Sequence, residues 1–248
     1  MSALELYAAA FPADPILDIA ISHALLADVA AGRRPPALRL FRPGPTVAFG
    51  RLDALLPGFG SACAAARDFG FTPVLRSVGG HAAVFDGGCV VVEHLTHEDD
   101  ATSGLHARFE RQARRVRDAL ASLGADARIG QLAGEYCAGE YSVNVGGRIK
   151  VVGIAQRMVR HGALTSAIVV VAGGPELRAA IAAVYAELEI PIDPATAGAL
   201  DEALPGVTVE AVAERIRGAY ADQELEPREI DAALVAEAST LTARHRAP

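Results

Sequence analysis

The spacing of apolar residues predicts a chain of mixed helices and strands. After Asp14, which can cap a helix, and Pro15, which suits a first helical turn, apolar positions recur on one face until Gly32. The same spacing predicts further helices at 61–69, 103–123, 175–188, 208–222 and 229–244. Alternation of apolar and polar residues, or a short apolar run, predicts strands at 38–42, 46–50, 72–77, 82–85, 89–95, 141–145, 148–152 and 166–172.

Two glycine-rich turns indicate how these strands are joined. Asp86-Gly87-Gly88 separates the strands at 82–85 and 89–95, and Gly146-Gly147 separates those at 141–145 and 148–152. Both sequences are typical of β-hairpins. Because hairpins outnumber strand-helix-strand units, we predict an α+β fold with a mixed, largely antiparallel sheet flanked by helices. No repeat or linker is evident, so we expect one domain over 1–248 with a helical C-terminal segment at about 175–248.

Composition and charge narrow the class of protein. The 248 residues are 51% hydrophobic and 21% charged, which is typical of a folded globular chain. The net charge of -7 argues against a nucleic-acid partner, and the arginines of 108–118 alternate with acidic residues as on a solvated helix face. No basic leader and no apolar run of about 20 residues is present, so we expect a cytoplasmic protein with no membrane partner.

The three cysteines stand in different surroundings. Cys63 lies among alanines of a predicted helix and Cys89 begins an apolar strand, so both are expected in the core. Cys137 lies instead in GEYCAGEYSVNVGGRIK, with glycines at 134 and 139 and tyrosines on either side. Such glycines let the backbone approach a ligand closely, and the tyrosines can form a pocket wall. Cys137 is therefore a candidate nucleophile, although its spacing alone also allows a structural role.

Lys150 is the only lysine of the chain, all other side-chain cations apart from histidine being arginines. A catalytic thiolate needs a nearby cation, base or backbone donor. If the Gly146-Gly147 hairpin folds back beside the Cys137 loop, Lys150 supplies that cation. The alternative is an exposed lysine on a hairpin edge.

A second group of candidate residues lies in RSVGGHAAVFDGG, at 76–88. Arg76 and the amides of Gly79 and Gly80 can donate hydrogen bonds to a carbonyl, carboxylate or phosphate, although Gly79-Gly80 can equally be a simple tight turn. His94, His97 and His106, with Glu93 and Glu98, lack a recognised metal-ligand spacing. We expect these five residues to be solvated and predict no metal site.

Three ordered segments, PALRLFRPGPTVAFGR, LRSVGGHAAVFDGG and KVVGIAQRM, resemble the lipoate-protein ligase and octanoyltransferase family, which is related to the biotin protein ligases. The resemblance runs from the first helix to about residue 172 and implies a biotin/lipoate protein ligase-like catalytic domain. The family contains ATP-dependent ligases and cysteine-dependent acyltransferases. GEYCAGEYSVNVGGRIK looks like the cysteine loop of the second kind, closest to the octanoyl amidotransferases, and His81 replaces a third glycine that is usual in the ligases.

The resemblance implies a role for each candidate residue. Cys137 forms a thioester with an octanoyl or lipoyl group, Lys150 holds the acyl carbonyl, and the acyl group passes to the lysine of a lipoyl carrier domain. The substrate would be bound by Arg76, Gly79, Gly80, His81, Gly153, Ala155 and Gln156. The partners would be the glycine-cleavage carrier protein, dehydrogenase subunits or acyl carrier protein, and no cofactor would be needed.

Two alternatives remain open. The first is an ATP-dependent lipoate or octanoate ligase, which would need ATP and Mg. The second is a non-catalytic fatty-acid or acyl-carrier binding protein. Ser142 stands where the family often has an acidic residue, and the arginine stretch of the ligases is reduced to RMVRHGAL, which leaves the donor and acceptor open. Only about three helices are expected after residue 175, so we expect no additional ligase domain there.

Overall fold

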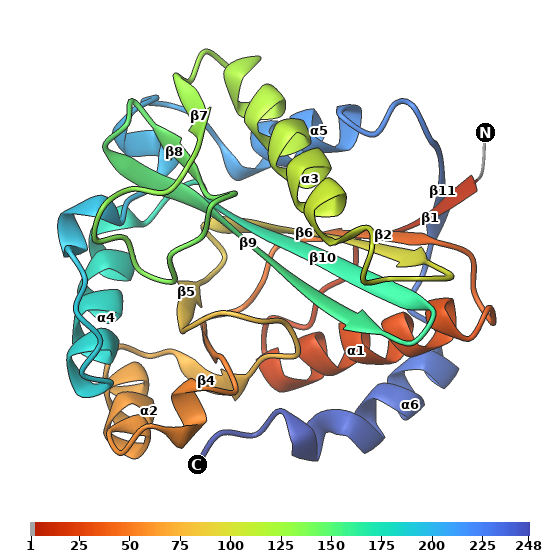
Figure 1. Ribbon diagram of the computed structural model, residues 1–248, viewed down its shortest axis with the longest axis horizontal. Coiled ribbons are helices and arrows are strands. Elements are labelled where there is room, and N and C mark those ends of the chain that lie inside the picture. The colour runs from red at the N-terminus through yellow and green to blue at the C-terminus, as the bar shows by residue number, and fades with distance from the viewer. Residues whose placement is uncertain (1–2) are drawn as a thin grey trace.

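The computed structural model describes residues 3–248 and places helices on both faces of a large sheet (Figure 1). One face is covered by α1 and α6, and the other by α3 and α5. The helices are α1 (Pro15–Ala30), α2 (Phe59–Asp68), α3 (Leu105–Ala121), α4 (Gly174–Glu187), α5 (Val209–Gly218) and α6 (Ala232–Leu241). All six predicted helices are therefore confirmed, and Asp14 caps α1 through a 3.0 Å hydrogen bond from the Leu17 amide.

Two sheets make up the β structure. The large sheet has the order β11-β1-β2-β6-β10-β9-β8-β7, and the small one has the order β4-β3-β5. In the large sheet β1 is parallel to β2 and β11, and the other neighbours are antiparallel. The predicted mixed, largely antiparallel α+β fold is thus confirmed. The strands are β1 (Ala3–Tyr7), β2 (Ala37–Phe41), β3 (Thr46–Phe49), β4 (Thr72–Leu75), β5 (Ala83–Phe85), β6 (Cys89–His97), β7 (Ala127–Ile129), β8 (Val143–Val145), β9 (Ile149–Val159), β10 (Gly162–Val170) and β11 (Glu224–Arg228).

One predicted hairpin is confirmed and the other is wrong. β8 and β9 pair across Gly146-Gly147, whose positive φ angles of 64° and 68° suit a tight hairpin turn. β5 and β6, by contrast, belong to different sheets, because β5 pairs with β3 whereas β6 pairs with β2 and β10. Asp86 accepts a hydrogen bond from the Gly88 amide, which turns the chain from one sheet into the other. A glycine-rich turn therefore predicts a reversal of direction but not the pairing partner.

Strands β1, β7 and β11 were not predicted, and the first element is β1 rather than a helix. β11 contains Pro227 and mostly charged residues, and it lies at the sheet edge. An edge strand exposed to solvent needs no apolar alternation, so the pattern that identifies buried strands is missing.

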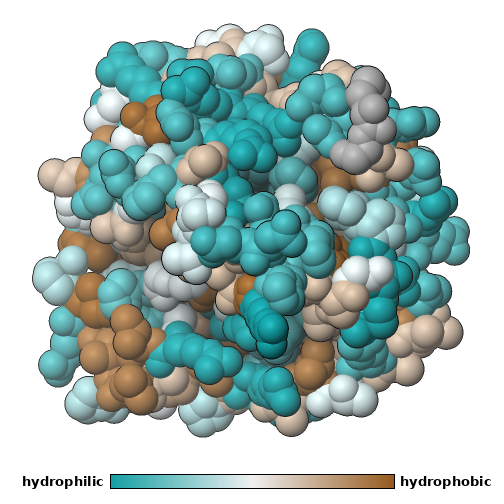
Figure 2. Space-filling view, turned by 45° about the vertical axis from the view of Figure 1, so that its right-hand side comes forward, coloured by the Kyte–Doolittle hydropathy of each residue, from teal (hydrophilic) through white to brown (hydrophobic). Residues whose placement is uncertain are grey.

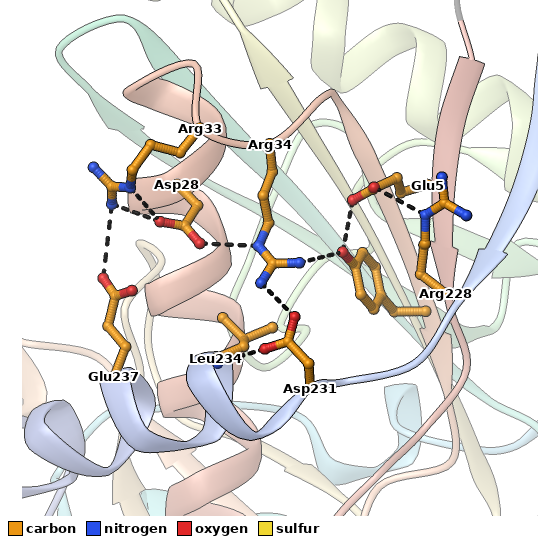
Figure 3. Close-up of polar contacts among 9 residues, drawn as sticks. Glu5, Asp28, Arg33, Arg34, Arg228, Asp231, Leu234 and Glu237 are labelled. Atoms are coloured by element: carbon orange, nitrogen blue, oxygen red, sulfur yellow. Dashed lines mark hydrogen bonds and ion pairs between the residues drawn. The ribbon is translucent and has the colours of Figure 1, made fainter.

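The C-terminal segment is fastened to the N-terminal half by a network of charged groups (Figure 3). Arg34 donates hydrogen bonds to Asp28 (3.0 Å), Asp231 (2.8 Å) and the Tyr7 hydroxyl (3.1 Å), and so joins α1, β1 and the start of α6. Arg228 of β11 donates to Glu5 of β1 at 3.1 Å. The tail beyond α6 is consequently held beneath α1 and runs back to β4.

Hydrophilic residues cover most of the face in Figure 2, with a group of hydrophobic residues at its lower left. Among residues 3–248, no helix combines the length and apolar character that crossing a bilayer requires.

Candidate active site

A cavity lies between α1, the small sheet and the face of the large sheet that α1 covers. Its empty volume is about 940 Å³ when the space at its open mouth is included. Its apolar wall is suited to a flexible hydrocarbon chain. That wall includes Pro15, Ile19, Phe41, Ala48, Val78, Ala83, Val84, Phe85, Val91, Tyr136, Gly153, Ile154, Ala155 and Ile168.

The register of the sheet arranges the cavity floor in rows. Val91 lies opposite Phe41 and Ile168, and Gly153 continues this apolar row on β9. The next row along the strands is largely polar, with Glu93 beside Ser166 and Arg39. The cavity floor therefore offers an apolar row with a polar row at its side.

The polar row is a buried network that sequence reasoning missed. Arg39, fully buried, donates to Asp18 (2.5 Å) and Ser22 (2.8 Å) of α1, and Ser22 donates to Glu93. Burial raises the pKa of the Asp18 and Glu93 carboxyls above their ordinary values, although Arg39 opposes this. Glu93 was expected to be solvated, and that expectation is wrong. The alternation of apolar and polar residues along β6 does not show that Glu93 is buried, because its partners lie on other elements.

Cys137 sits at one end of the cavity in a constrained loop. Its φ of 42° is in the left-handed region, which is uncommon for a non-glycine residue and occurs often at functional sites. The Cys137 amide donates to the Tyr185 hydroxyl at 2.8 Å, and that hydroxyl donates to the Ala82 carbonyl. Arg76, also buried, places Nη2 3.3 Å from Cys137 Sγ. The guanidinium is thus within hydrogen-bonding distance of the sulfur.

Lys150 is buried beneath the same loop. Its Nζ donates to the carbonyl oxygens of Tyr136 and Cys137, each at 2.9 Å, and to Glu135 Oε1 at 3.0 Å. The lysine side chain is 1% exposed, so the alternative of an exposed lysine on a hairpin edge is wrong. Its ammonium also lies 4.7 Å from the centre of the Tyr136 ring. The β8–β9 hairpin therefore brings the only lysine of the chain against the cysteine loop.

Glu135, a residue that sequence reasoning missed, completes this arrangement. Its fully buried carboxylate accepts hydrogen bonds from Lys150, from the Ser142 hydroxyl (2.7 Å) and from the amides of Leu132 and Gly139. Ser142, which stands where the family often has an acidic residue, thus contacts an acidic residue instead. A glutamate two positions before a cysteine, with a lone lysine on the following hairpin, was the signal available in the sequence.

The Gly79-Gly80 turn lies against the sulfur. Gly80 has a φ of 92°, and a Cβ there would lie 2.8 Å from Cys137 Sγ, so only glycine fits. The Gly79 amide already donates to the Gln156 carbonyl at 3.2 Å. His81 does not line the cavity; its Nδ1 lies 2.6 Å from Asp53 Oδ1, and its carbonyl accepts a hydrogen bond from Arg76.

The residues assigned to substrate binding separate into two groups. Arg76, Gly153 and Ala155 line the cavity, and Gly80 lies beside its reactive end. The Gln156 side chain instead bonds to Arg108 (3.0 Å) and to the Leu105 carbonyl (2.9 Å) of α3, and so faces away from the cavity.

The other cysteines and the histidines have structural surroundings. Cys63 and Cys89 are buried in the core, as expected. His97 and His106 are exposed, whereas His94 packs edge-on against Tyr220, and burial lowers the pKa of His94 to about 4. The expectation that His94 is solvated is therefore wrong. His94 lies on the face of β6 that is turned away from α1, and α3 and α5 cover that face. Among residues 3–248, no three His, Cys, Asp or Glu side chains are grouped so as to hold a metal ion.

Alkylation should distinguish the three thiols. Burial raises the pKa of the Cys63 thiol to about 11 and that of Cys89 to about 12, so both stay protonated and shielded at neutral pH. Cys137 is half-buried beside Arg76. We expect iodoacetamide at pH 7.5 to label Cys137 alone in the folded protein and all three cysteines after unfolding, as measured by peptide mapping. Equal labelling of Cys63 or Cys89 in the folded protein would contradict this assignment.

Comparison with known protein families adds to this geometry. The profile of the lipoyl protein ligase A/B catalytic domain matches residues 14–221. An octanoyl-GcvH:protein N-octanoyltransferase of Geobacillus kaustophilus is 32% identical over 169 residues, which cover 68% of this chain and 59% of that protein. The enzyme of the same name from Oceanobacillus iheyensis is 26% identical over 83% of this chain and 77% of its own. A lipoyl-GcvH:protein N-lipoyltransferase of Listeria monocytogenes is 25% identical over a stretch that covers 60% of this chain and 53% of that protein. The chain thus spans under two thirds of the Geobacillus and Listeria proteins.

Solved structures share the fold. The crystal structure of lipoate-protein ligase A bound with ATP superimposes with a TM-score of 0.75 and 18% identity, covering 98% of this chain and 95% of that one. The bi-partite lipoate protein ligase of Thermoplasma acidophilum gives a TM-score of 0.72 at 18% identity, covering 98% and 93%. At this identity the likeness is one of fold alone.

Proposed function

This chain belongs to the lipoyl protein ligase A/B catalytic domain family, and on that premise we propose that it is an acyltransferase of protein lipoylation. It moves an octanoyl or lipoyl group through a thioester on Cys137 to the lysine of a lipoyl carrier domain. The names of the Geobacillus and Oceanobacillus relatives support a carrier of the GcvH kind as donor. The observation that carries the proposal is that Cys137 Sγ accepts a hydrogen bond from Arg76 at the end of an apolar cavity.

Two half-reactions account for the transfer. In the first, Cys137 Sγ bonds to the acyl carbonyl carbon, the C–N bond to the donor lysine breaks, and the thiol proton leaves on that amine. In the second, the amine of the acceptor lysine forms the new C–N bond, the C–S bond breaks, and a proton returns to sulfur. One acyl–lysine amide bond is broken and another of the same kind is formed, so the overall free-energy change is small. The exchange therefore requires neither ATP nor another co-reactant.

The surrounding groups have separate roles in this proposal. Arg76 donates a hydrogen bond to the Cys137 sulfur and so holds it in place for attack. Lys150 fixes the backbone of the cysteine loop through two carbonyl oxygens, and its charge lies next to the position of the acyl carbonyl. The charge that develops on that oxygen in the tetrahedral intermediate needs donors already in place. The Gly79 amide is bonded to Gln156, and the three Nζ hydrogens of Lys150 are bonded to Tyr136, Cys137 and Glu135. The remaining amides of the turn therefore donate to this oxygen, with the Lys150 ammonium nearby.

The test is a transfer assay without nucleotide. Octanoyl-loaded GcvH and an acceptor dehydrogenase lipoyl domain are mixed with the full chain, and the acceptor is followed by intact mass. Octanoylation of the acceptor in the absence of ATP is the expected result. A strict requirement for ATP, with release of AMP and pyrophosphate from free octanoate, would instead establish the ligase alternative. Binding of octanoate with no transfer under either condition would establish a binding protein.

A further inference from the structure

A group of arginines borders the segment that separates the cavity from the solvent. Residues 76–78 line the cavity on one side, and the Ser77 carbonyl accepts a hydrogen bond from Arg157 of β9 at 3.0 Å on the other. Arg51 follows Gly50, whose backbone packs against the Gly80 carbonyl. Arg244 precedes His245, which bonds to the Leu75 carbonyl at 2.7 Å. Arg51, Arg157 and Arg244 therefore lie on segments that contact residues 75–80 at one side of the cavity, and we call this group the cationic rim.

None of these three arginines makes an ion pair with another residue of the described range 3–248. Within the described part of the chain, residues 3–248, none of them lies within 4.0 Å of a carboxylate, whereas most other arginines make ion pairs. Their mutual proximity contributes to a lowered pKa of the Arg157 guanidinium, after burial as the main cause. A protein with a net charge of -7 thus keeps an unneutralised cationic group at its active-site rim.

The cationic rim is built on rigid structure. His23 of α1 lies between Arg157 (3.5 Å) and His245 (3.0 Å), so α1, β9 and the C-terminal tail meet there. The network of Figure 3 fastens β11 and α6 to α1 and β1, and so fixes the tail that carries Arg244. On the same rim Leu52, 67% exposed, adds an apolar side chain next to Arg51.

We propose that Arg51, Arg157 and Arg244 form the docking face for an acidic surface of the carrier domain near its acylated lysine. This inference rests on the proposed function and specifies its partner. Opposite charges brought together at the rim raise the association rate and orient the carrier, so that its lysine is directed past residues 76–80 toward Cys137. Because the enzyme is acidic overall, an acidic carrier approaches it productively only at a local cationic face.

The experiment compares two double charge reversals. Arg51→Glu/Arg244→Glu alters the rim, and Arg148→Glu/Arg217→Glu changes the net charge equally on the β8–β9 hairpin and α5, in the upper part of Figure 1. All four arginines are exposed and make no ion pair among the described residues. We expect the rim variant to lower kcat/KM for octanoyl-loaded GcvH about tenfold or more relative to the control variant. The dependence of kcat/KM on salt should also become weaker in the rim variant.

An uncharged donor separates this proposal from the proposed function. Octanoyl-N-acetylcysteamine thioester should acylate Cys137 in the wild type and in both double variants at rates within about twofold, because it needs no docking face. If the rim variant uses octanoyl-loaded GcvH as well as the control variant does, the docking face is refuted. If the wild type forms no adduct on Cys137 from either donor, the proposed function itself fails.

Discussion

Replacing Cys137 by serine is expected to lower octanoyl transfer at least ~10³-fold, because the loss of a covalent nucleophile removes the acyl-enzyme route altogether. Serine nearly conserves the volume of cysteine. It can keep the left-handed backbone conformation and the hydrogen bond from the amide of residue 137 to the Tyr185 hydroxyl. It replaces the sulfur that Arg76 contacts by a less nucleophilic hydroxyl oxygen. The expected measurement is the initial rate of acceptor octanoylation, with circular dichroism and the unfolding midpoint showing an unchanged fold.

The matched control is Cys63→Ala, which removes a thiol that is buried in the core away from the cavity. That variant should keep its transfer rate within a few-fold while losing some stability through a small void. Transfer by Cys137→Ser at the wild-type rate would show that the sulfur of Cys137 takes no part in the chemistry.

Replacing Lys150 by methionine is expected to affect both stability and transfer. The substitution leaves the Glu135 carboxylate buried without its cation, since the two side chains are 1% and 0% exposed. Breaking a buried ion pair in this way costs about 3–5 kcal/mol in the free energy of unfolding. Transfer should fall at least ~10²-fold, because the loop loses two carbonyl contacts and the developing oxyanion loses a cation. Urea unfolding and the transfer assay measure the two effects.

A double variant separates these contributions. Glu135→Gln/Lys150→Met removes both charges, so the unfolding penalty should become much smaller than that of Lys150→Met alone. Transfer should remain low, because no cation is restored. Recovery of transfer together with stability would mean that Lys150 acts only as a structural partner of Glu135.

Local patterns were sufficient for most of the fold. Apolar spacing with capping residues identified the six helices, and Gly146-Gly147 identified the hairpin that places Lys150. Pairing between distant strands was beyond these patterns, as the separate sheets of β5 and β6 show. The edge strand β11 was missed because a solvent-exposed strand carries no apolar alternation.

Site residues could be predicted from the sequence where their residue type was unusual. They could not be predicted where their role depends on being buried in the fold. A cysteine among glycines and a single lysine stood out in the sequence, whereas Glu135 and Glu93 looked like ordinary surface carboxylates. Both are buried because partners from distant segments satisfy them, Lys150 for Glu135 and Arg39 with Ser22 for Glu93. His81 and Gln156 were placed near the substrate by resemblance, yet their side chains bond to Asp53 and Arg108.

The central claim is that the acyl group passes through Cys137, and the direct measurement is rapid-quench mass spectrometry of the enzyme. The full chain is mixed with octanoyl-loaded GcvH, digested and mapped, and then chased with the acceptor lipoyl domain. We predict one octanoyl group on the peptide that contains Cys137, formed and discharged at least as fast as the overall transfer. Octanoylation of the acceptor at the full rate with no adduct on Cys137 at any time would contradict the account.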